Sequence, residues 1–233
     1  MRERLYTIPV NEAFEHSHEQ GGCPFCVLFR RLEEEELDLI LGASMMEPDV
    51  RIITNKKGFC PTHYAKMFPR KNRLGLALML ESHLDELQKQ IKSGAILTKD
   101  KGAKSVARIA ALEESCYVCD RIEDKLSKMF QTALLLFSEE PEFRKKFAEA
   151  PLLCLTHYRR VLEMGKACLK RDVYDLLVKT AGGIVEGYLK SLGADISWFC
   201  KKFDYRYDSE PWGNAKDSVE RAIQFLSGPV DLP

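Results

Sequence analysis

The stretch CPFCVLFRRLEEEELDLILG, residues 23–42, combines an amphipathic helix with a pair of cysteines at its start. Its apolar side chains recur at intervals of three and four residues, which places them on one face of a helix. Sustained strand alternation is nearly absent from the chain, and helical periodicity recurs in six further stretches. These are residues 72–91, 120–137 and 171–192, and the shorter segments 48–55, 141–150 and 218–226. The sequence therefore predicts an all-α protein.

Six of the eight cysteines form two blocks with the same pattern. Each block has a CxxC pair followed, after 33 or 34 residues, by a CxxH pair. The first block is Cys23, Cys26, Cys60 and His63, and the second is Cys116, Cys119, Cys154 and His157. PDVR at 48–51 also aligns with PEFR at 141–144, at the same offset as the CxxC pairs. These matches predict two related halves that arose by internal duplication.

The repeat also predicts the organisation of the chain. We expect a first helical half over residues 1–96 and a second over 106–196, with the charged segment 97–105 as the seam between them. Residues 197–233 have no counterpart in the first half. They are expected to form a C-terminal strap that packs on both halves within one compact unit.

The Cys/His blocks indicate zinc. Cysteine thiolate and histidine imidazole are the ligands of structural zinc sites, which are normally four-coordinate and tetrahedral. Two ligands three residues apart in the first turn of a helix are neighbours on one face, and the positive end of the helix dipole favours thiolate. We expect two zinc ions per chain, one held within each block, because the shorter loop costs less entropy to close. Four protein ligands would close each site, so the metal is expected to be structural and the protein non-enzymatic.

Two alternatives remain open on the sequence. CPFC resembles the active-site dithiol of thioredoxin-fold oxidoreductases, although no β-α-β frame precedes it, so a thiol-redox role stays an alternative. Iron–sulfur ligation by three cysteines and a histidine is a minor alternative that spacing does not exclude.

The amino-acid composition limits the classes of partner that we expect. Lysine plus arginine equals aspartate plus glutamate, at 35 each, so no nucleic acid partner is expected. No apolar run is long enough to span a bilayer, and no membrane association is expected. Eight cysteines without a signal peptide indicate a cytoplasmic protein whose thiols serve a purpose other than disulfides. The partner is expected to be a protein or a small molecule that the sequence does not identify.

Several residues outside the blocks are also candidates for a structural or functional role. The run EEEE at 33–36 is interpreted as the solvated face of its helix, and Cys168 and Cys200 as buried core positions. Extra metal ligation by His16 or His18 is weighed against a solvated N-terminal segment, which is favoured. The C-terminal strap carries a candidate ligand or partner surface, because aromatic and arginine side chains are enriched in interface hot spots. Its residues are Asp204, Tyr205, Arg206, Tyr207 and Trp212.

The motifs CPFC, GFCPTHY, NRLGLAL, CYVC and LCLTHY, with FDYRY and PWG near the C-terminus, together resemble a bacterial family. It is classed as a domain of unknown function and is found largely in anaerobic Firmicutes. The resemblance covers nearly the whole chain. It implies a bacterial cytosolic protein with paired Cys/His blocks and no established activity.

Overall fold

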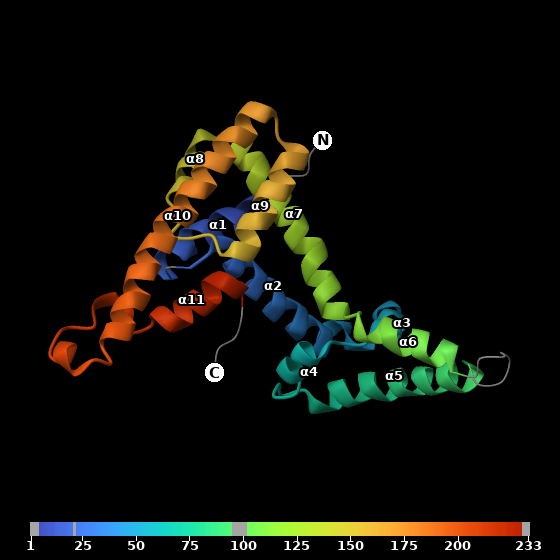
Figure 1. Cartoon of the computed structure of the whole chain (residues 1–233). Coiled ribbons are helices and arrows are strands. Elements are labelled where there is room, and N and C mark those ends of the chain that lie inside the picture. The colour runs from blue at the N-terminus through green and yellow to red at the C-terminus, as the bar shows by residue number, and fades with distance from the viewer. Residues whose placement is uncertain (1–4, 21, 95–101, 230–233) are drawn as a thin grey trace. The chain divides into compact units, whose positions relative to one another are not determined.

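The structure is a computed structural model that describes residues 5–20, 22–94 and 102–229 (Figure 1). Within these ranges every regular element is helical, which confirms the predicted all-α class. The α-helices are α1 Thr7–Gln20, α2 Pro24–Leu41, α3 Pro48–Lys57, α4 Pro61–Met67, α5 Arg73–Gly94, α6 Ala103–Glu113, α7 Tyr117–Glu139, α8 Pro141–Ala148, α9 Leu155–Cys168, α10 Arg171–Lys201 and α11 Ser218–Ser227. Short 3-10 turns lie at η1 Ala43–Met46, η2 Tyr205–Tyr207 and η3 Gly213–Ala215.

Proline marks the start of several helices. Pro48, Pro61 and Pro141 each occupy the first turn of their helices α3, α4 and α8. The first N–H of a helix has no partner within the helix, so proline loses no hydrogen bond there. Each of the seven predicted helices exists, with ends that differ from the expectation by a few residues except in α10.

Three features of the helices differ from the expectation. Helix α1 lies in the segment interpreted as solvated, and α6 begins at Ala103 inside the expected seam, most of which falls outside the described residues. Helix α10 continues nine residues beyond Leu192 to Lys201. Gly193, which costs a helix about 1 kcal/mol relative to alanine, does not stop it.

The spatial contacts between residues divide the chain into two compact units. Unit 1 comprises residues 1–30 and 126–233, and unit 2 comprises residues 31–125. The boundaries fall within α2 and α7, so each of these helices contributes residues to both units. The units are therefore different segments from the sequence halves 1–96 and 106–196, since unit 1 takes residues from both ends of the chain.

The core of unit 1 is built around phenylalanine rings. Phe14 of α1 packs edge-on against Phe143 of α8, with 5.0 Å between ring centroids, and lies 5.4 Å from Phe147. Phe25 of α2 stacks on Phe130 of α7 at 4.0 Å. All five rings are buried, and ring pairs of this kind add about 0.5–1.5 kcal/mol each to the burial of their area. The cluster connects α1, α2, α7 and α8, and two of its rings, Phe25 and Phe130, lie beside the imidazole of His157.

Unit 2 packs α3 and α6 against the long helix α5. Arg51 of α3 donates from Nη2 to the carbonyl oxygen of Leu78 and to Oγ of Ser82, at 2.5 and 2.6 Å. His83 of α5 lies with Nδ1 2.9 Å from the carbonyl oxygen of Asn55. His83 is therefore a buried helix residue whose ring contacts the backbone of a neighbouring helix.

The acidic run at 33–36 is not a uniformly solvated face, and this expectation is wrong for two of its four residues. Glu34 and Glu35 are exposed, but Glu33 is 8 % and Glu36 1 % exposed. Glu36 is paired with Nζ of Lys125 at 2.6 Å and Nε of Arg121 at 3.3 Å, both from α7. Buried carboxylates need such partners because an unpaired buried charge is strongly destabilising.

Candidate metal centres

All eight predicted ligands gather in two groups. Site A consists of Cys23, Cys26, Cys154 and His157, and site B consists of Cys60, His63, Cys116 and Cys119. Within each site the four ligand atoms all lie within 4.8 Å of one another. Site A belongs wholly to unit 1 and site B wholly to unit 2.

The expected pairing within each sequence block is wrong. Each site takes its CxxC pair from one block and its CxxH pair from the other. Helix α2 shows why, because it continues from Cys26 to Leu41 and so carries the chain about 22 Å from Cys26 before the path toward Cys60 begins. Closing the longer loop from Cys26 to Cys154 costs only about 1 kcal/mol more, since each doubling of length adds about 0.6 kcal/mol. Helix direction therefore outweighs loop entropy.

All four ligand pairs have the same local geometry. The first cysteine of each pair directly precedes a helix, and its carbonyl oxygen accepts the first helical hydrogen bond. These bonds are Val27 N to Cys23 O, Tyr64 N to Cys60 O, Asp120 N to Cys116 O and Tyr158 N to Cys154 O, at 2.8–3.1 Å. The second ligand is the third residue of the helix. Both ligands of a pair therefore face the same side at the positive end of a helix dipole, where a thiolate is favoured.

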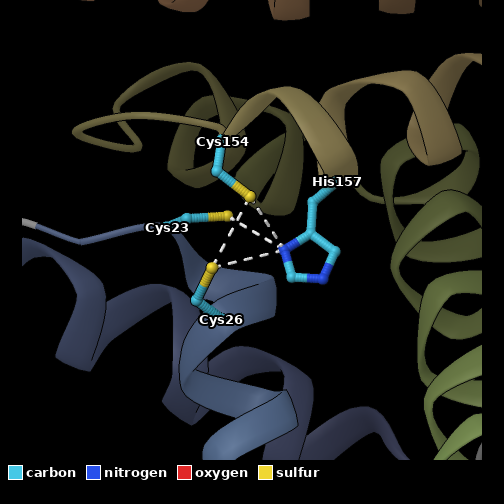
Figure 2. Close-up of side chains that lie close together, drawn as sticks. All are labelled: Cys23, Cys26, Cys154 and His157. Atoms are coloured by element: carbon cyan, nitrogen blue, oxygen red, sulfur yellow. Dashed lines mark hydrogen bonds between the residues drawn. The ribbon is translucent and has the colours of Figure 1, made fainter. Parts of the chain in front are cut away.

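In site A the sulfur atoms surround one nitrogen of the imidazole (Figure 2). Nδ1 of His157 lies 3.2 Å from Sγ of Cys154, 3.4 Å from Sγ of Cys26 and 3.6 Å from Sγ of Cys23. Sγ of Cys26 and Sγ of Cys154 are 3.6 Å apart. All four side chains are buried.

Site B repeats this arrangement with its own residues. Nδ1 of His63 lies 3.1 Å from Sγ of Cys60, 3.2 Å from Sγ of Cys116 and 3.4 Å from Sγ of Cys119. Sγ of Cys60 and Sγ of Cys119 are 3.9 Å apart. In contrast to site A, Cys60 is half-buried and Cys119 is exposed.

These separations fit one tetrahedral ion in each site. Zinc bound to sulfur at ~2.3 Å and to nitrogen at ~2.0–2.1 Å places two sulfurs about 3.8 Å apart, and a sulfur about 3.6 Å from a nitrogen. The Cys26–Cys154 and Cys60–Cys119 sulfur pairs are 3.6 and 3.9 Å apart, the other donor pairs lie within 4.8 Å, and the sulfur–nitrogen distances run from 3.1 to 3.6 Å. A single ion at the centre of each group would therefore reach all four donors with small adjustments.

The two imidazole rings have different surroundings. In site B, Nε2 of His63 lies 3.3 Å from Oε1 of Glu33, and Lys66 pairs with the other oxygen of the same carboxylate. In site A, the ring of His157 lies 5.9 Å from the ring of Phe25 and 5.7 Å from that of Phe130. A carboxylate behind a metal-binding histidine fixes its orientation and raises its basicity, whereas aromatic rings restrict it by packing.

Protonation in site B is strongly perturbed. A hydrogen bond from Cys119 lowers the pKa of Cys116; burial opposes this, the contact with His63 reinforces it, and the result is a pKa of about 3. Burial works to lower the pKa of His63, but the contacts with Cys116 and Glu33 outweigh it and raise the pKa to about 10. The pKa of Glu33 is lowered because His63 and Lys66 together outweigh its burial. The site therefore favours a thiolate beside an imidazolium, a polar arrangement suited to exchange protons for a cation.

In site A, too, one cysteine has a lowered pKa, and all four side chains of this site are buried. Hydrogen bonds from Cys23 and Cys26 lower the pKa of Cys154. Burial is the main cause that raises the pKa of Cys23 to about 12. One cysteine thus carries the negative charge while its neighbours donate to it, and metal binding would release the remaining protons.

The residues of the expected partner surface lie apart from the metal ligands. Asp204 accepts from the backbone N–H of Arg206 and forms an exposed ion pair with its guanidinium. Tyr207 packs edge-on against Trp198, and Trp212 lies 5.6 Å from Phe199. Tyr205 is 88 % exposed. Helix α11, in the same C-terminal region, packs on α9 and α10.

Lys202 holds this loop together, although its only signal in the sequence is its position between aromatic residues. Its Nζ donates to the carbonyl oxygens of Tyr207, Asp208 and Glu210 at 2.7, 2.9 and 2.8 Å. The side chain is only 8 % exposed and lies over the ring of Trp212. The loop that carries the aromatic residues is therefore fixed by a buried ammonium group.

The remaining cysteines and histidines lie outside both sites. Cys168 and Cys200 are exposed, so their expected burial is wrong. Cys168 is the last residue of α9 and Cys200 is the second-last residue of α10, so both lie at helix ends. His16 of α1 contacts the carbonyl oxygen of Glu12 and is not a member of either group.

Comparison with known proteins adds an identity without an activity. Among the described residues, no helix has both the length and the apolar character needed to cross a membrane. Neither the curated proteins nor the solved structures gave a match to this chain. One family model, described as "Family of unknown function (DUF6062)", matches residues 1–232. Because that match covers almost every residue, including all eight ligands, the chain belongs to the DUF6062 family.

Proposed function

We propose that this protein binds two zinc ions in structural sites and acts as a helical binding or adaptor protein rather than an enzyme. One observation carries the proposal: sites A and B each bring three thiols and one imidazole nitrogen to the separations of a tetrahedral ion. Four protein ligands leave no open position for a substrate, which is the arrangement of structural rather than catalytic zinc.

The crossed pairing supports a structural role. Each ion would connect two helix starts that are far apart in sequence, α2 with α9 in site A and α4 with α7 in site B. Metal binding would then contribute directly to folding. We propose that the two blocks arose by duplication and that their CxxH segments exchanged partners, which would give both sites the same local geometry.

Free thiols support a reducing location. All eight cysteines lie in the described part of the chain and none forms a disulfide there, as is usual for a protein of the bacterial cytoplasm, where we propose that it resides. The adaptor role has support from the C-terminal loop. Phe203 and Tyr205 are 76 % and 88 % exposed, and Lys202 fixes the loop that bears them. Exposed aromatic side chains on a fixed loop are suited to bind a protein partner.

Iron–sulfur and thiol-redox chemistry remain the alternatives. In an iron–sulfur cluster the protein ligands bind different iron atoms, so their donor atoms lie further apart than on one ion. Donor atoms within 4.8 Å of one another favour a single ion. A redox-active dithiol would need the two cysteines of a CxxC pair to react with each other. In site A, however, Cys26 contacts Cys154 and His157.

Elemental analysis of the untagged protein tests the proposal. We expect about two zinc ions per chain, and their removal by a chelator should lower the helical circular dichroism signal and the melting temperature. Cys168→Ala provides a matched control, because this exposed cysteine lies outside both sites and its loss should leave the metal content unchanged. Iron with acid-labile sulfide, or a stable protein free of metal, would overturn the proposal.

A further inference from the structure

Sites A and B have the same donors and the same spacing but differ in their access to solvent. The four ligands of site A are between 1 % and 7 % exposed. In site B, Cys119 is exposed and Cys60 is half-buried, and their sulfur atoms are 3.9 Å apart. The two sites therefore have the same donor types, but a reagent in solution can reach the thiols of site B more readily than those of site A.

Helix α11 accounts for the protection of site A. It packs on α9 and α10, and Phe225, 1 % exposed, anchors it 5.2 Å from the ring of Tyr188. The chain then passes directly over the site. A Cβ at Gly228 would lie 3.3 Å from Oγ1 of Thr156 and 3.8 Å from Sγ of Cys154. The end of α11 therefore lies against the sulfur of a ligand.

A cavity lies beside site A. It measures about 290 Å³, and it is lined by Cys23, Cys26 and Cys154 together with residues of α11 such as Arg221 and Phe225. The C-terminal region that has no counterpart in the first sequence block thus forms one wall around site A.

The neighbourhood of Cys119 in site B is open. The next residue, Asp120, forms an ion pair with Lys57, and the side chains are 52 % and 38 % exposed, respectively. Ion pairs at such exposure contribute little and exchange readily with solvent. A small oxidant can therefore reach Sγ of Cys119, which then has a second accessible sulfur within 3.9 Å.

We propose that site B is a peroxide-sensitive metal site, in which Cys119 is oxidised first and then forms a disulfide with Cys60. Cys119 is a thiolate when it ligates the ion. Its sulfur attacks one oxygen of a hydroperoxide, the O–O bond breaks, and hydroxide or alkoxide leaves, which gives a sulfenic acid. The thiolate of Cys60 attacks that sulfur, the S–O bond breaks, and a hydroxide leaves. Two thiolates lose two electrons and the peroxide gains them.

Metal release follows from this chemistry. A disulfide brings the two sulfur atoms from 3.9 Å to about 2.05 Å and removes two of the four ligands. Cys116 and His63 alone would not retain a structural ion, so the ion leaves. Site A, whose thiols are shielded, keeps its ion under the same conditions.

This inference rests on the proposed zinc sites, and the experiment separates the two. The protein is first analysed for metal, in a Cys168→Ser, Cys200→Ser background that removes the exposed thiols outside the sites. Hydrogen peroxide is then added in small excess. Released zinc is followed with a colorimetric chelator, bound zinc by native mass spectrometry, and the thiols by alkylation and peptide mapping.

The expected result is loss of one ion per chain, at least ~10-fold sooner than the other, together with a Cys60–Cys119 disulfide. Equal rates of loss, retention of both ions, or a first disulfide between any other cysteines would overturn the inference while leaving the metal assignment intact. A protein that contains no metal at the outset would instead overturn the proposed function.

A second variant tests the role of α11. Phe225→Ala should loosen the helix and accelerate peroxide-driven loss of the ion from site A, without changing the rate at site B. Leu226→Ala is the matched control, because Leu226 is in the same helix but 59 % exposed. If Phe225→Ala folds, as its circular dichroism would show, and releases the ion of site A no faster, then α11 is not the shield.

Discussion

Oε1 of Glu33 lies 3.3 Å from Nε2 of His63, while Nδ1 of the same ring faces the three sulfur atoms of site B. The carboxylate and the sulfur atoms thus contact the two different nitrogens of one imidazole. Glu33 is nearly buried and shares its charge with Lys66. It stabilises the orientation in which Nδ1 is available to a metal.

Glu33→Gln should weaken zinc binding at site B by about 10–100-fold, because the amide keeps the shape of the side chain but loses the charge. Competition with a chelator of known affinity measures this for each site. Glu34→Gln is the control, since Glu34 lies on the exposed side of α2 and pairs with Arg70. Equal affinities for the two variants would show that Glu33 has no influence on the metal.

The crossed pairing makes a specific prediction for double variants. Cys23→Ala combined with Cys154→Ala removes two ligands of site A and should leave one zinc bound. Cys23→Ala combined with Cys60→Ala damages both sites and should leave none. Elemental analysis of the two proteins decides the matter. The reverse result would restore the pairing within each sequence block.

Lys202→Met should lower the free energy of unfolding of the C-terminal loop by about 2–3 kcal/mol, since three carbonyl oxygens lose a charged donor. Both tryptophans of the chain, Trp198 and Trp212, lie in or beside this loop, so their fluorescence in a urea titration reports on it directly. Lys201→Met is the control, because Lys201 is exposed. A transition that coincides with that of the control would contradict the role assigned to Lys202.

Phe130→Ala should destabilise unit 1 by about 3–5 kcal/mol. The ring is fully buried, stacks on Phe25 and borders the imidazole of His157. Urea unfolding in excess zinc measures the change while the sites stay loaded. Phe203→Ala, which truncates a ring that is 76 % exposed, should change the midpoint little. Similar midpoints for both variants would show that Phe130 does not contribute to the core that stabilises unit 1.

The ligands and most helices could be predicted because each rests on a local pattern. CxxC and CxxH place two donors on one helix turn, and periodicity locates the buried faces of α2, α7 and α10. Helix α1 was missed although Val10, Ala13, Phe14 and Ser17 are all buried at helical spacing. Its buried stripe is short and ends in a polar residue, so the periodic signal is weak.

The pairing of the ligands could not be read from the repeat, because the direction of α2 and α7 after each CxxC pair depends on tertiary packing. The burial of Glu36 did leave a signal, since Leu32, Glu36 and Ile40 share one helix face. The charge of Glu36 predicts that its side chain is exposed to solvent. Its spacing from Leu32 and Ile40 instead predicts that it lies on the buried face of the helix. The partner groups, Arg121 and Lys125, come from α7 and become visible only in the structure.

The position of site A at the starts of α2 and α9 also determines its electrical balance. A zinc ion with three thiolates and a neutral imidazole carries a net charge of about −1. Two helix N-termini, at about +0.5 each, offset that charge where it is buried among phenylalanine rings. With cysteine in place of His157 an excess negative charge would remain, and with a second histidine an excess positive one. With zinc bound, three cysteines and one histidine would therefore be the donor set that makes this centre electroneutral without a counter-ion.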